Sequence, residues 1–316
     1  MSECTERSEG RERTQKPALR EPGIVVAGSA NMDLVGLAER LPVPGETVLG
    51  DDFLMVPGGK GANQAIAAAR AGGRCTFLGA IGSDAFGVSL KARLTASGVD
   101  TTHLRVSYGS SGVAVIMVDR HGENSIIVSP GANSTFTDLT AAERAAIGDA
   151  DVLVCQQEIP VATVTEAARV ARAAGTRVVL NAAPARPLPP ELLAAVDLLV
   201  VNENEARAVT GLPEPDLGAL LALAPLVVLT LGADGARYAE RDGRDERIPA
   251  YRVEVADSTA AGDAFTGALA VAWGEGRDLV EAVRWAAAAG AVCVRTVGAS
   301  VSLPTRADID ALYGGG

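Results

Sequence analysis

The segment DSTAAGDAFTG, residues 257–267, combines two carboxylates with a run of very small residues. Ala260, Ala261 and Gly262 carry almost no side chain, so a ligand can approach their backbone closely. If a helix begins at Ala264, the first amides of that helix are unpaired and form an anion site at the positive end of its dipole. Such a site suits the charge that gathers on a phosphoryl group during its transfer.

Asp263 is predicted to project into the same space. There it could accept the proton of a substrate hydroxyl as that oxygen attacks phosphorus, and general bases typically contribute ~10²–10⁴-fold to a rate. The alternative is that Asp263 only caps the helix, a contribution of ~1 kcal/mol to stability. The local sequence leaves both interpretations open.

The stretch GGKGANQ, residues 58–64, forms a second candidate site. It is not a P-loop, because Gly61 follows Lys60 where Ser or Thr must hold magnesium. It is not a G-x-G-x-x-G loop either, because Gln64 occupies the place of the last glycine. What remains is a flexible backbone with one ammonium and the side-chain amide of Asn63. These groups suit a polyhydroxyl ligand, although a flexible solvated turn remains the alternative.

Two further motifs follow predicted strands. Asn202 and Glu205 lie three residues apart at a helix start, and a carboxylate there could hold magnesium near a triphosphate through water, unless Asn202 is only a cap. Thr230, Gly232 and Gly235 end an apolar strand. A backbone this open could pass close to phosphates or a ribose, or it could be a plain hairpin turn.

Composition excludes several classes of protein. The 316 residues carry a formal net charge of −11, which argues against a nucleic-acid surface. No apolar run approaches ~18 residues, so we expect no membrane span. The only histidines, His103 and His121, fall in predicted surface turns, which disfavours a Ser-His-Asp triad or a His-rich metal site. The four cysteines are scattered without C-x-x-C spacing, as expected of reduced thiols in a cytoplasmic protein.

Strands alternate with helices along most of the chain. We predict strands at 24–27, 75–82, 151–156, 176–181, 196–202 and 226–232, and helices that follow the 58–64 loop as far as Gly72 and then cover 87–98, 161–175, 203–211, 262–276 and 279–298. This alternation is typical of βαβ units, so the predicted fold is α/β, a doubly wound, mostly parallel sheet flanked by helices. We expect a disordered tail over residues 1–22 and a single domain over 23–313.

Two segments, about 33–56 and 107–130, do not fit the alternation and are predicted to be antiparallel strands, the second with a hairpin at 120–123. They could form a small antiparallel β lid that stands off the main sheet, or an antiparallel edge of that sheet. In open α/β sheets ligands bind outside the carboxyl ends of the strands, so the motifs described above are expected to meet there.

Two of these motifs carry a resemblance to a known family. Two segments of the chain, in this order, resemble the two sequence signatures of the ribokinase-like family of carbohydrate kinases: PGGKGANQAIAAARAGG and DSTAAGDAFTGALAVA. The segments LNAAPARPLP and VNENEA are also similar to sequences of this family. The resemblance covers about residues 23–313. It implies the ribokinase-like fold with the β lid, and a kinase that uses ATP with Mg²⁺ and is activated by a monovalent cation, K⁺.

The resemblance also implies residue roles. Asp263 matches the catalytic base, and Ala260, Ala261 and Gly262 match the anion hole. The sugar-binding positions are Asn31, Asp33, Gly59, Lys60, Asn63, Glu158 and Asp263 itself. The nucleotide-binding positions are Asn202, Thr230, Gly232, Ala233, Gly235, Ala261, Gly262 and Ala287. Glu205 matches the acid linked to Mg²⁺ through water, and the K⁺ positions are Asp257, Thr259, Cys293, Thr296, Gly298 and Ser302. Two residues depart from relatives: Ala287, where a polar residue is common, and Thr259, which replaces an aliphatic residue.

The implied function is ATP-dependent phosphorylation of D-ribose at O5 to give ribose 5-phosphate, in a cytoplasmic homodimer that pairs through its lid. The partners are then a small sugar and ATP, with no nucleic acid and no membrane. Two alternatives stay open. One is a kinase of another small sugar or a nucleoside, such as 2-deoxyribose, on the same fold. The other is a catalytically silent sugar-binding regulatory protein. A hydrolase or dehydrogenase lacks its required residues.

Overall fold

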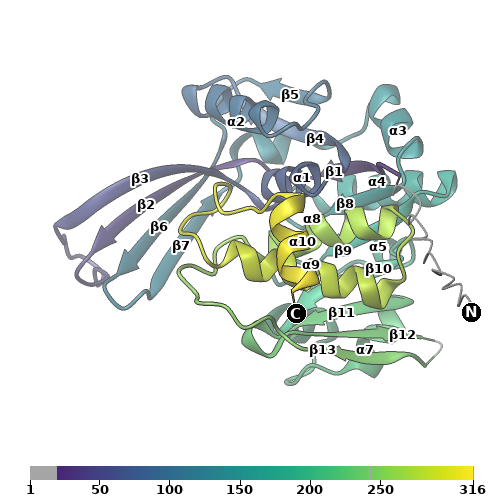
Figure 1. Ribbon diagram of the computed structural model, residues 1–316. Coiled ribbons are helices and arrows are strands. Elements are labelled where there is room, and N and C mark those ends of the chain that lie inside the picture. The colour runs from purple at the N-terminus through teal and green to yellow at the C-terminus, as the bar shows by residue number, and fades with distance from the viewer. Residues whose placement is uncertain (1–19, 242, 316) are drawn as a thin grey trace, which may run out of the picture.

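A nine-stranded, mostly parallel sheet organises the chain, with helices on both of its faces (Figure 1). The computed structural model describes residues 20–241 and 243–315, so most of the predicted tail, residues 1–19, lies outside the described residues. The predicted fold class is confirmed. Across the part of the chain that is described, no helix combines the length and the apolar character that crossing a bilayer requires.

The sheet has the order β13-β12-β11-β10-β9-β8-β1-β4-β5, and every pair from β11 to β5 is parallel. The strand order reverses at β1, which lies between β8 and β4, so a ligand site is expected beyond the carboxyl ends of β1 and β8. The strands are β1 (Gly23–Ala27), β4 (Arg74–Gly82), β5 (Leu104–Ser107), β8 (Val152–Cys155), β9 (Arg177–Asn181), β10 (Leu198–Asn202), β11 (Leu226–Thr230), β12 (Ala236–Glu240) and β13 (Asp245–Ile248).

Successive residues of the strands point into two different cores, because side chains alternate across a strand. In β1, Ile24 and Val26 pack into one core and Val25 and Ala27 into the other. The first core is covered by α1 (Lys60–Arg70), α2 (Ala85–Ala96), α8 (Ala261–Gly274), α9 (Leu279–Cys293) and α10 (Arg306–Gly314). The second is covered by α3 (Ala141–Gly148), α4 (Val161–Ala174), α5 (Pro190–Leu193), α6 (Glu203–Thr210) and α7 (Leu217–Leu223).

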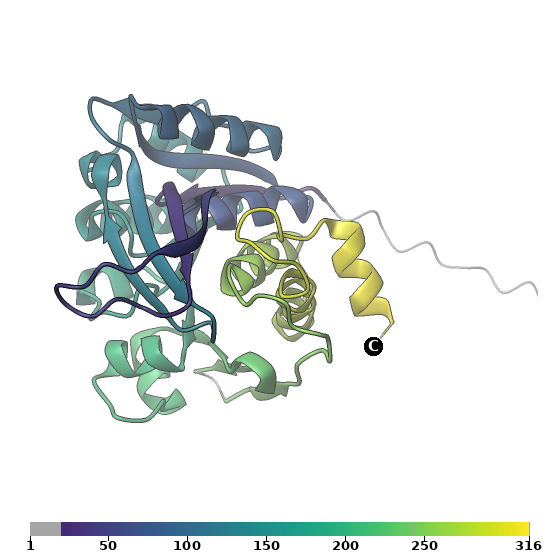
Figure 2. The same ribbon diagram turned by 90° about the vertical axis from the view of Figure 1, so that its left-hand side faces the viewer.

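A separate four-stranded sheet, which we call the lid, projects from the body of the molecule and crosses in front of it in Figure 2. It consists of β2 (Asn31–Ala38), β3 (Gly50–Gly58), β6 (Gly112–Asp119) and β7 (Asn124–Ser129), in the order β3-β2-β6-β7. Each of its two hairpins is antiparallel, and the hairpins join through a parallel pairing of β2 with β6. The two segments that break the alternation therefore form this lid, and not an edge of the main sheet.

Some boundaries differ from the prediction. Helix α8 begins at Ala261 and not at Ala264, because Ala260 adopts a left-handed backbone (φ 62°) and turns the chain into the helix early. Helix α9 ends at Cys293, five residues before the expected end. The edge strands β5 and β13, the strand β12 next to β13, and the helices α3, α5, α7 and α10 were not predicted. They are short or solvent-exposed, so they carry little hydrophobic periodicity.

Candidate active site

The loop after β1 meets the start of α1 beyond the carboxyl ends of the central strands. Two glycines allow this close approach. A Cβ on Gly61 would lie 2.5 Å from the amide nitrogen of Ser29, and one on Gly28 would collide with the side chain of Gln156. The amide of Ala62 donates to the carbonyl of Ser29 at 2.8 Å, which holds α1 against the end of β1.

Helices α1 and α8 cross at a third glycine. A Cβ on Gly267 would lie 2.7 Å from the carbonyl oxygen of Gln64 and 2.6 Å from the Cβ of Ala67. Gly267 is one helical turn after Asp263, so this contact brings the first turns of the two helices side by side. Asn63 and Gln64 consequently face Asp263.

Asp263 is buried, with 7% of its surface exposed. Its Oδ1 accepts a hydrogen bond from Gln64 Nε2 at 2.9 Å, and its Oδ2 accepts one from Asn63 Nδ2 at 3.1 Å. Burial raises the pKa of Asp263, while the Lys60 ammonium and the two amide donors partly offset this rise. The N-cap of α8 is Ala260, without a side-chain cap bond, so Asp263 is not a helix cap and the alternative interpretation is wrong.

The first turn of α8 presents unpaired amides. The amide of Ala261 donates to the carbonyl of Ser258 at 3.3 Å, whereas the described residues offer no acceptor to the amides of Gly262 and Asp263. Of the predicted set 260–262, Ala261 alone has an acceptor for its amide among the described residues, and the amide of Ala260 is free like that of Gly262. The amides of Gly262 and Asp263 lie at the positive end of a helix of 14 residues, where an anion is favoured.

Glu158, which follows β8, joins the loop after β1 to the start of α1. Its Oε2 accepts hydrogen bonds from the hydroxyl of Ser29 at 2.5 Å, the amide of Lys60 at 3.1 Å and the side chain of Asn31 at 3.5 Å. Gly59 precedes α1 with φ 91°, a conformation that favours glycine, and directs the chain into this contact. Three of the predicted sugar-binding positions therefore meet around one carboxylate.

Lys60 lies among the predicted carboxylates. Burial lowers the pKa of this ammonium, but Asp263, Glu158, Glu205 and Asp33 together raise it, so Lys60 stays charged. Asp33 reaches the site from the lid strand β2, and burial together with the charges of Glu158 and Asp263 raises its pKa to about 7. The site therefore holds several acids around one cation, which suits hydroxyl groups better than a second anion.

A cavity of about 880 Å³ opens beside the first turn of α8. It lies between the β11–β13 edge of the main sheet and helices α8 and α9. Seven of the predicted nucleotide-binding residues line it: Thr230, Gly232, Ala233, Gly235, Ala261, Gly262 and Ala287. The eighth, Asn202, does not. Thr230 to Gly235 also forms the turn between the antiparallel strands β11 and β12. The segment is therefore a hairpin turn and at the same time part of the cavity wall.

Asn202 and Glu205 form a reciprocal capping box at the start of α6. Asn202 Oδ1 accepts from the amide of Glu205, and Glu205 Oε2 accepts from the amide of Asn202, both at 2.8 Å. Burial raises the pKa of Glu205. Residues 20–241 and 243–315 contain no group of three or more His, Cys, Asp or Glu residues that could hold a metal ion, so a Mg²⁺ near Glu205 would depend on water and phosphate oxygens.

The predicted cation-binding segments are joined by Asp257. Its Oδ1 accepts from the amide of Thr259 at 2.9 Å and from its hydroxyl at 2.6 Å, and its Oδ2 accepts from the amide of Gly298 at 2.9 Å. Although burial raises the pKa of Asp257, these bonds lower it below its usual value. The loop containing Thr259 and the loop that includes Thr296, Gly298 and Ser302 are thereby held together.

Cys293 lies against both of these loops. Its thiol donates to the carbonyl of Thr259 at 3.6 Å and lies 3.1 Å from the hydroxyl of Ser302. Burial raises the pKa of this thiol, so the sulfur stays protonated. Any contribution of Cys293 to a cation site would come from its carbonyl oxygen, and the remaining donors are oxygens as well. An oxygen-rich set of this kind fits K⁺.

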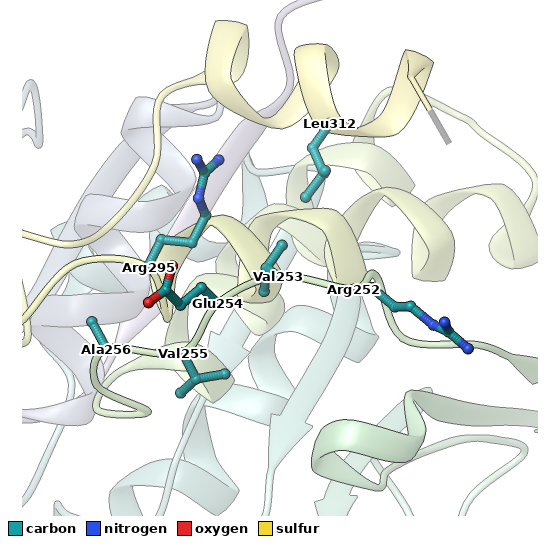
Figure 3. Close-up of a pocket in the computed structure, with 7 residues that line it drawn as sticks. All are labelled: Arg252, Val253, Glu254, Val255, Ala256, Arg295 and Leu312. Carbon is teal, nitrogen blue, oxygen red and sulfur yellow. The ribbon is translucent and has the colours of Figure 1, made fainter.

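A second cavity, of about 610 Å³, lies on another side of the segment 252–256 and contains none of the predicted site residues (Figure 3). Arg295 extends toward Leu312 of α10, whereas Arg252 points away along the loop. Arg252, Val253 and Val255 line both cavities, so this irregular segment separates them.

Sequence patterns missed several residues of the site. Tyr251, Val255 and Ser258 line the larger cavity. The segment between β13 and Asp257 has no periodicity that could indicate the first two, and Ser258 lies in the 257–267 segment without an assigned role. Ser29, Gln64 and Gln156 lie within or beside the predicted loops and were not assigned a role. The signal in the sequence was that these residues are polar and lie within or beside loops that follow predicted strands.

The open α/β sheet and the free amides of α8 beside a buried carboxylate suit a kinase that transfers a phosphoryl group to a hydroxyl. The sequence pattern of the pfkB family carbohydrate kinases matches residues 22–306, and the chain belongs to this family. It is 41% identical to ribokinase of Bacillus subtilis over 92% of this chain and 98% of that protein. It is 39% identical to ribokinase of Haemophilus influenzae over 90% of this chain and 95% of that protein.

Among solved structures, the chain resembles Arabidopsis thaliana ribokinase complexed with ribose and ATP, with a TM-score of 0.88. The two sequences are 33% identical, and the match covers 93% of this chain and 99% of that one. The likeness therefore extends over nearly the whole described fold, lid included.

Proposed function

We propose that the protein is a ribokinase, which transfers the γ-phosphoryl group of ATP to O5 of D-ribose. The observation that carries this proposal is the buried carboxylate of Asp263, set beside the free amides of Gly262 and Asp263 at the edge of the cavity. Relatives that are named ribokinases and cover most of the chain support ribose as the sugar.

The chemistry follows from this arrangement. Asp263 accepts the proton of the primary hydroxyl as the O5–P bond forms and the bond from phosphorus to the β-phosphate oxygen breaks, which releases ADP. The amides at the start of α8 stabilise the negative charge on the transferring group. Magnesium, when bound with the nucleotide, neutralises phosphate charge, and Glu205 would hold it through water.

The sugar is proposed to bind between the loop before α1 and the lid, against Asn31, Asp33, Gly59, Lys60, Asn63 and Glu158. Asn63 supports this placement directly. Its Oδ1 is buried and has no hydrogen-bond partner among the described residues, while its Nδ2 holds the catalytic carboxylate. A sugar hydroxyl would satisfy this oxygen, because an unpaired buried acceptor costs ~1–3 kcal/mol.

The proposal is tested with a panel of sugars and nucleosides in a coupled assay of ADP release. We expect D-ribose to give the highest kcat/KM, with a product that carries phosphate on O5. Preference for 2-deoxyribose or a nucleoside would keep the kinase mechanism and change the substrate. Binding of ribose without any ADP release would instead support a silent sugar-binding protein.

We also propose that K⁺ binds between the loops that Asp257 joins, with oxygen donors from Thr259, Thr296, Gly298 and Ser302. Exchange of K⁺ for tetramethylammonium at fixed Mg²⁺ should lower kcat by roughly tenfold, equivalent to ~1.4 kcal/mol of transition-state stabilisation. The physical reason is that the Thr259 loop leads directly into the amides of α8. Initial rates across K⁺ concentrations measure the effect, and a rate indifferent to the exchange contradicts the site.

The exposed apolar side chains of the lid support a homodimer that pairs through this sheet. Ile126 and Ile127, on opposite faces of β7, are 52% and 65% exposed, and Leu54 and Met55 of β3 are also exposed. Exposed apolar side chains gathered on one small sheet favour an interface. We expect a dimer mass by sedimentation and a monomer after the double change Ile126→Glu and Ile127→Glu. The control Val106→Glu, on the exposed edge strand β5, should remain dimeric.

The three described cysteines, Cys75, Cys155 and Cys293, are buried free thiols. Reduced cysteines are typical of proteins in a reducing compartment. This supports the proposed cytoplasmic location.

A further inference from the structure

A chain of buried side-chain amides lies behind the catalytic carboxylate, away from the cavity. Gln156 Nε2 donates to Gln64 Oε1 at 2.6 Å, and Gln64 Nε2 donates both to Asn181 Oδ1 at 3.0 Å and to Asp263 Oδ1 at 2.9 Å. Gln64 and Gln156 are fully buried, and Asn181 is 8% exposed. Four parts of the chain, α1, the loop after β8, β9 and α8, thus meet through one set of hydrogen bonds.

The orientation of these hydrogen-bonded amides is determined by the backbone carbonyl of Val200. Asn181 Nδ2 donates to the carbonyl of Val200 at 3.3 Å, and a carbonyl can only accept. Asn181 must therefore present its oxygen to Gln64, and Gln64 must present its nitrogen to Asn181. The second hydrogen of that nitrogen then points to Asp263, and the oxygen of Gln64 points to Gln156. If the Gln64 amide were rotated, its Oε1 would face Oδ1 of Asn181 and Oδ1 of Asp263, which cannot donate a hydrogen bond. Gln64 therefore has a single allowed orientation.

We propose that Gln64 is the residue that positions Asp263 for catalysis. It holds Oδ1 in place and leaves Oδ2, whose partner among the described residues is Asn63, to accept the proton of the substrate hydroxyl. This inference rests on the proposed function for the identity of the reaction. Gln64 itself is a positioning residue, because it acts through Asp263 and is packed behind it.

The charges around Asp263 define what the test must separate. Lys60 of α1 favours the ionised carboxylate, whereas Glu158 after β8, Asp33 of the lid and Glu205 of α6 disfavour it. Cys293 of α9 is also near, but its thiol is neutral. All five groups remain in a Gln64 variant. A change in the titration of Asp263 would therefore report the loss of the Gln64 donor.

The variant Gln64→Met keeps the length of the side chain and removes its hydrogen bonds. We expect kcat with ribose to fall roughly tenfold, the equivalent of one hydrogen bond to a charged group, while KM for ribose changes little. The acidic limb of the pH profile should move up by about one pH unit, because the carboxylate loses a donor that favours its charged form. Gln156 contacts Gln64 and not Asp263, so Gln156→Met should change kcat and the pH profile in the same directions but by less.

A matched control separates positioning from general destabilisation. Thr176 is buried and its hydroxyl donates to the carbonyl of Ile147 at 2.9 Å, so Thr176→Val removes a buried hydrogen bond far from the site. This control should lower Tm without moving the pH profile. A Gln64→Met enzyme that loses only Tm, as the control does, would overturn the proposal.

A readout without substrate makes the two proposals separable. The carboxyl ¹³C signal of Asp263, assigned by its absence in Asp263→Asn, should titrate at higher pH in Gln64→Met than in the wild type. If wild-type protein fails to phosphorylate ribose, the proposed function is wrong, yet this titration still decides the role of Gln64. An unchanged midpoint would overturn the positioning role.

Discussion

Replacement of Asp263 by asparagine lowers kcat for sugar phosphorylation by ~10²–10⁴-fold, the usual contribution of a general base. The amide cannot accept the hydroxyl proton, so attack on phosphorus must begin from a neutral alcohol. Binding should survive, because the shape of the side chain is kept. Steady-state kinetics with ribose and ATP measure kcat and both KM values.

The fold is expected to tolerate Asp263→Asn. The new amide oxygen can keep the hydrogen bond from Gln64, and Asn63 can turn its own amide so that its unpartnered Oδ1 accepts from the new nitrogen. Burial raises the pKa of Asp263 in the folded protein, so its contribution to stability is present below the unfolded pKa and is lost as the pH rises through the folded pKa. Removal of this charge at neutral pH should therefore leave Tm unchanged or higher.

A control for this change is Asp216→Asn. Asp216 is the N-cap of α7, distant from the site, and asparagine caps a helix equally well. The control should have wild-type rates. Activity of Asp263→Asn within a few-fold of wild type, with a stable fold, would remove Asp263 as the base.

Replacement of Gly262 by valine should abolish most activity without harming the fold. A Cβ on Gly262 meets no atom within 4 Å, and the residue is helical, so the protein itself has room for a larger side chain. The space that this side chain enters is the cavity that Gly262 lines, directly beside the free amides. It would displace the phosphoryl group from those amides, at a cost of ~10²–10³-fold in kcat, as for loss of an oxyanion donor.

The matched control is Gly314→Ala. Gly314 is also a helical glycine whose Cβ would meet nothing within 4 Å, but it lies in α10, away from the cavity. Both variants should keep the wild-type Tm or exceed it, since glycine within a helix costs ~0.5–1 kcal/mol relative to alanine. Only Gly262→Val should lose activity. Equal activity of the two variants would show that the transferring group does not approach the first turn of α8.

Much of the candidate site could be predicted because its signals are local. The small residues 260–262, the glycine loop 58–64 and the polar ends of β1 and β8 each follow from a few adjacent residues. Buried strands are continuous apolar runs and the longer helices have a clear period, so the order of the main elements was predicted as well. Polar edges such as β13 carry no such signal, because solvent accepts almost any side chain there.

The amino-acid sequence was enough to indicate candidate residues for phosphoryl transfer and to place them at the carboxyl ends of parallel strands. How these residues are held depends on contacts that form only in the folded chain. Gln64 and Asp263 are 199 residues apart in the chain, and their hydrogen bond exists because Gly267 lets α1 and α8 pack closely. The amide of Asp263 is free as well because Ala260 turns the backbone into α8 at Ala261. Contacts of this kind depend on packing between distant segments, which no local pattern encodes.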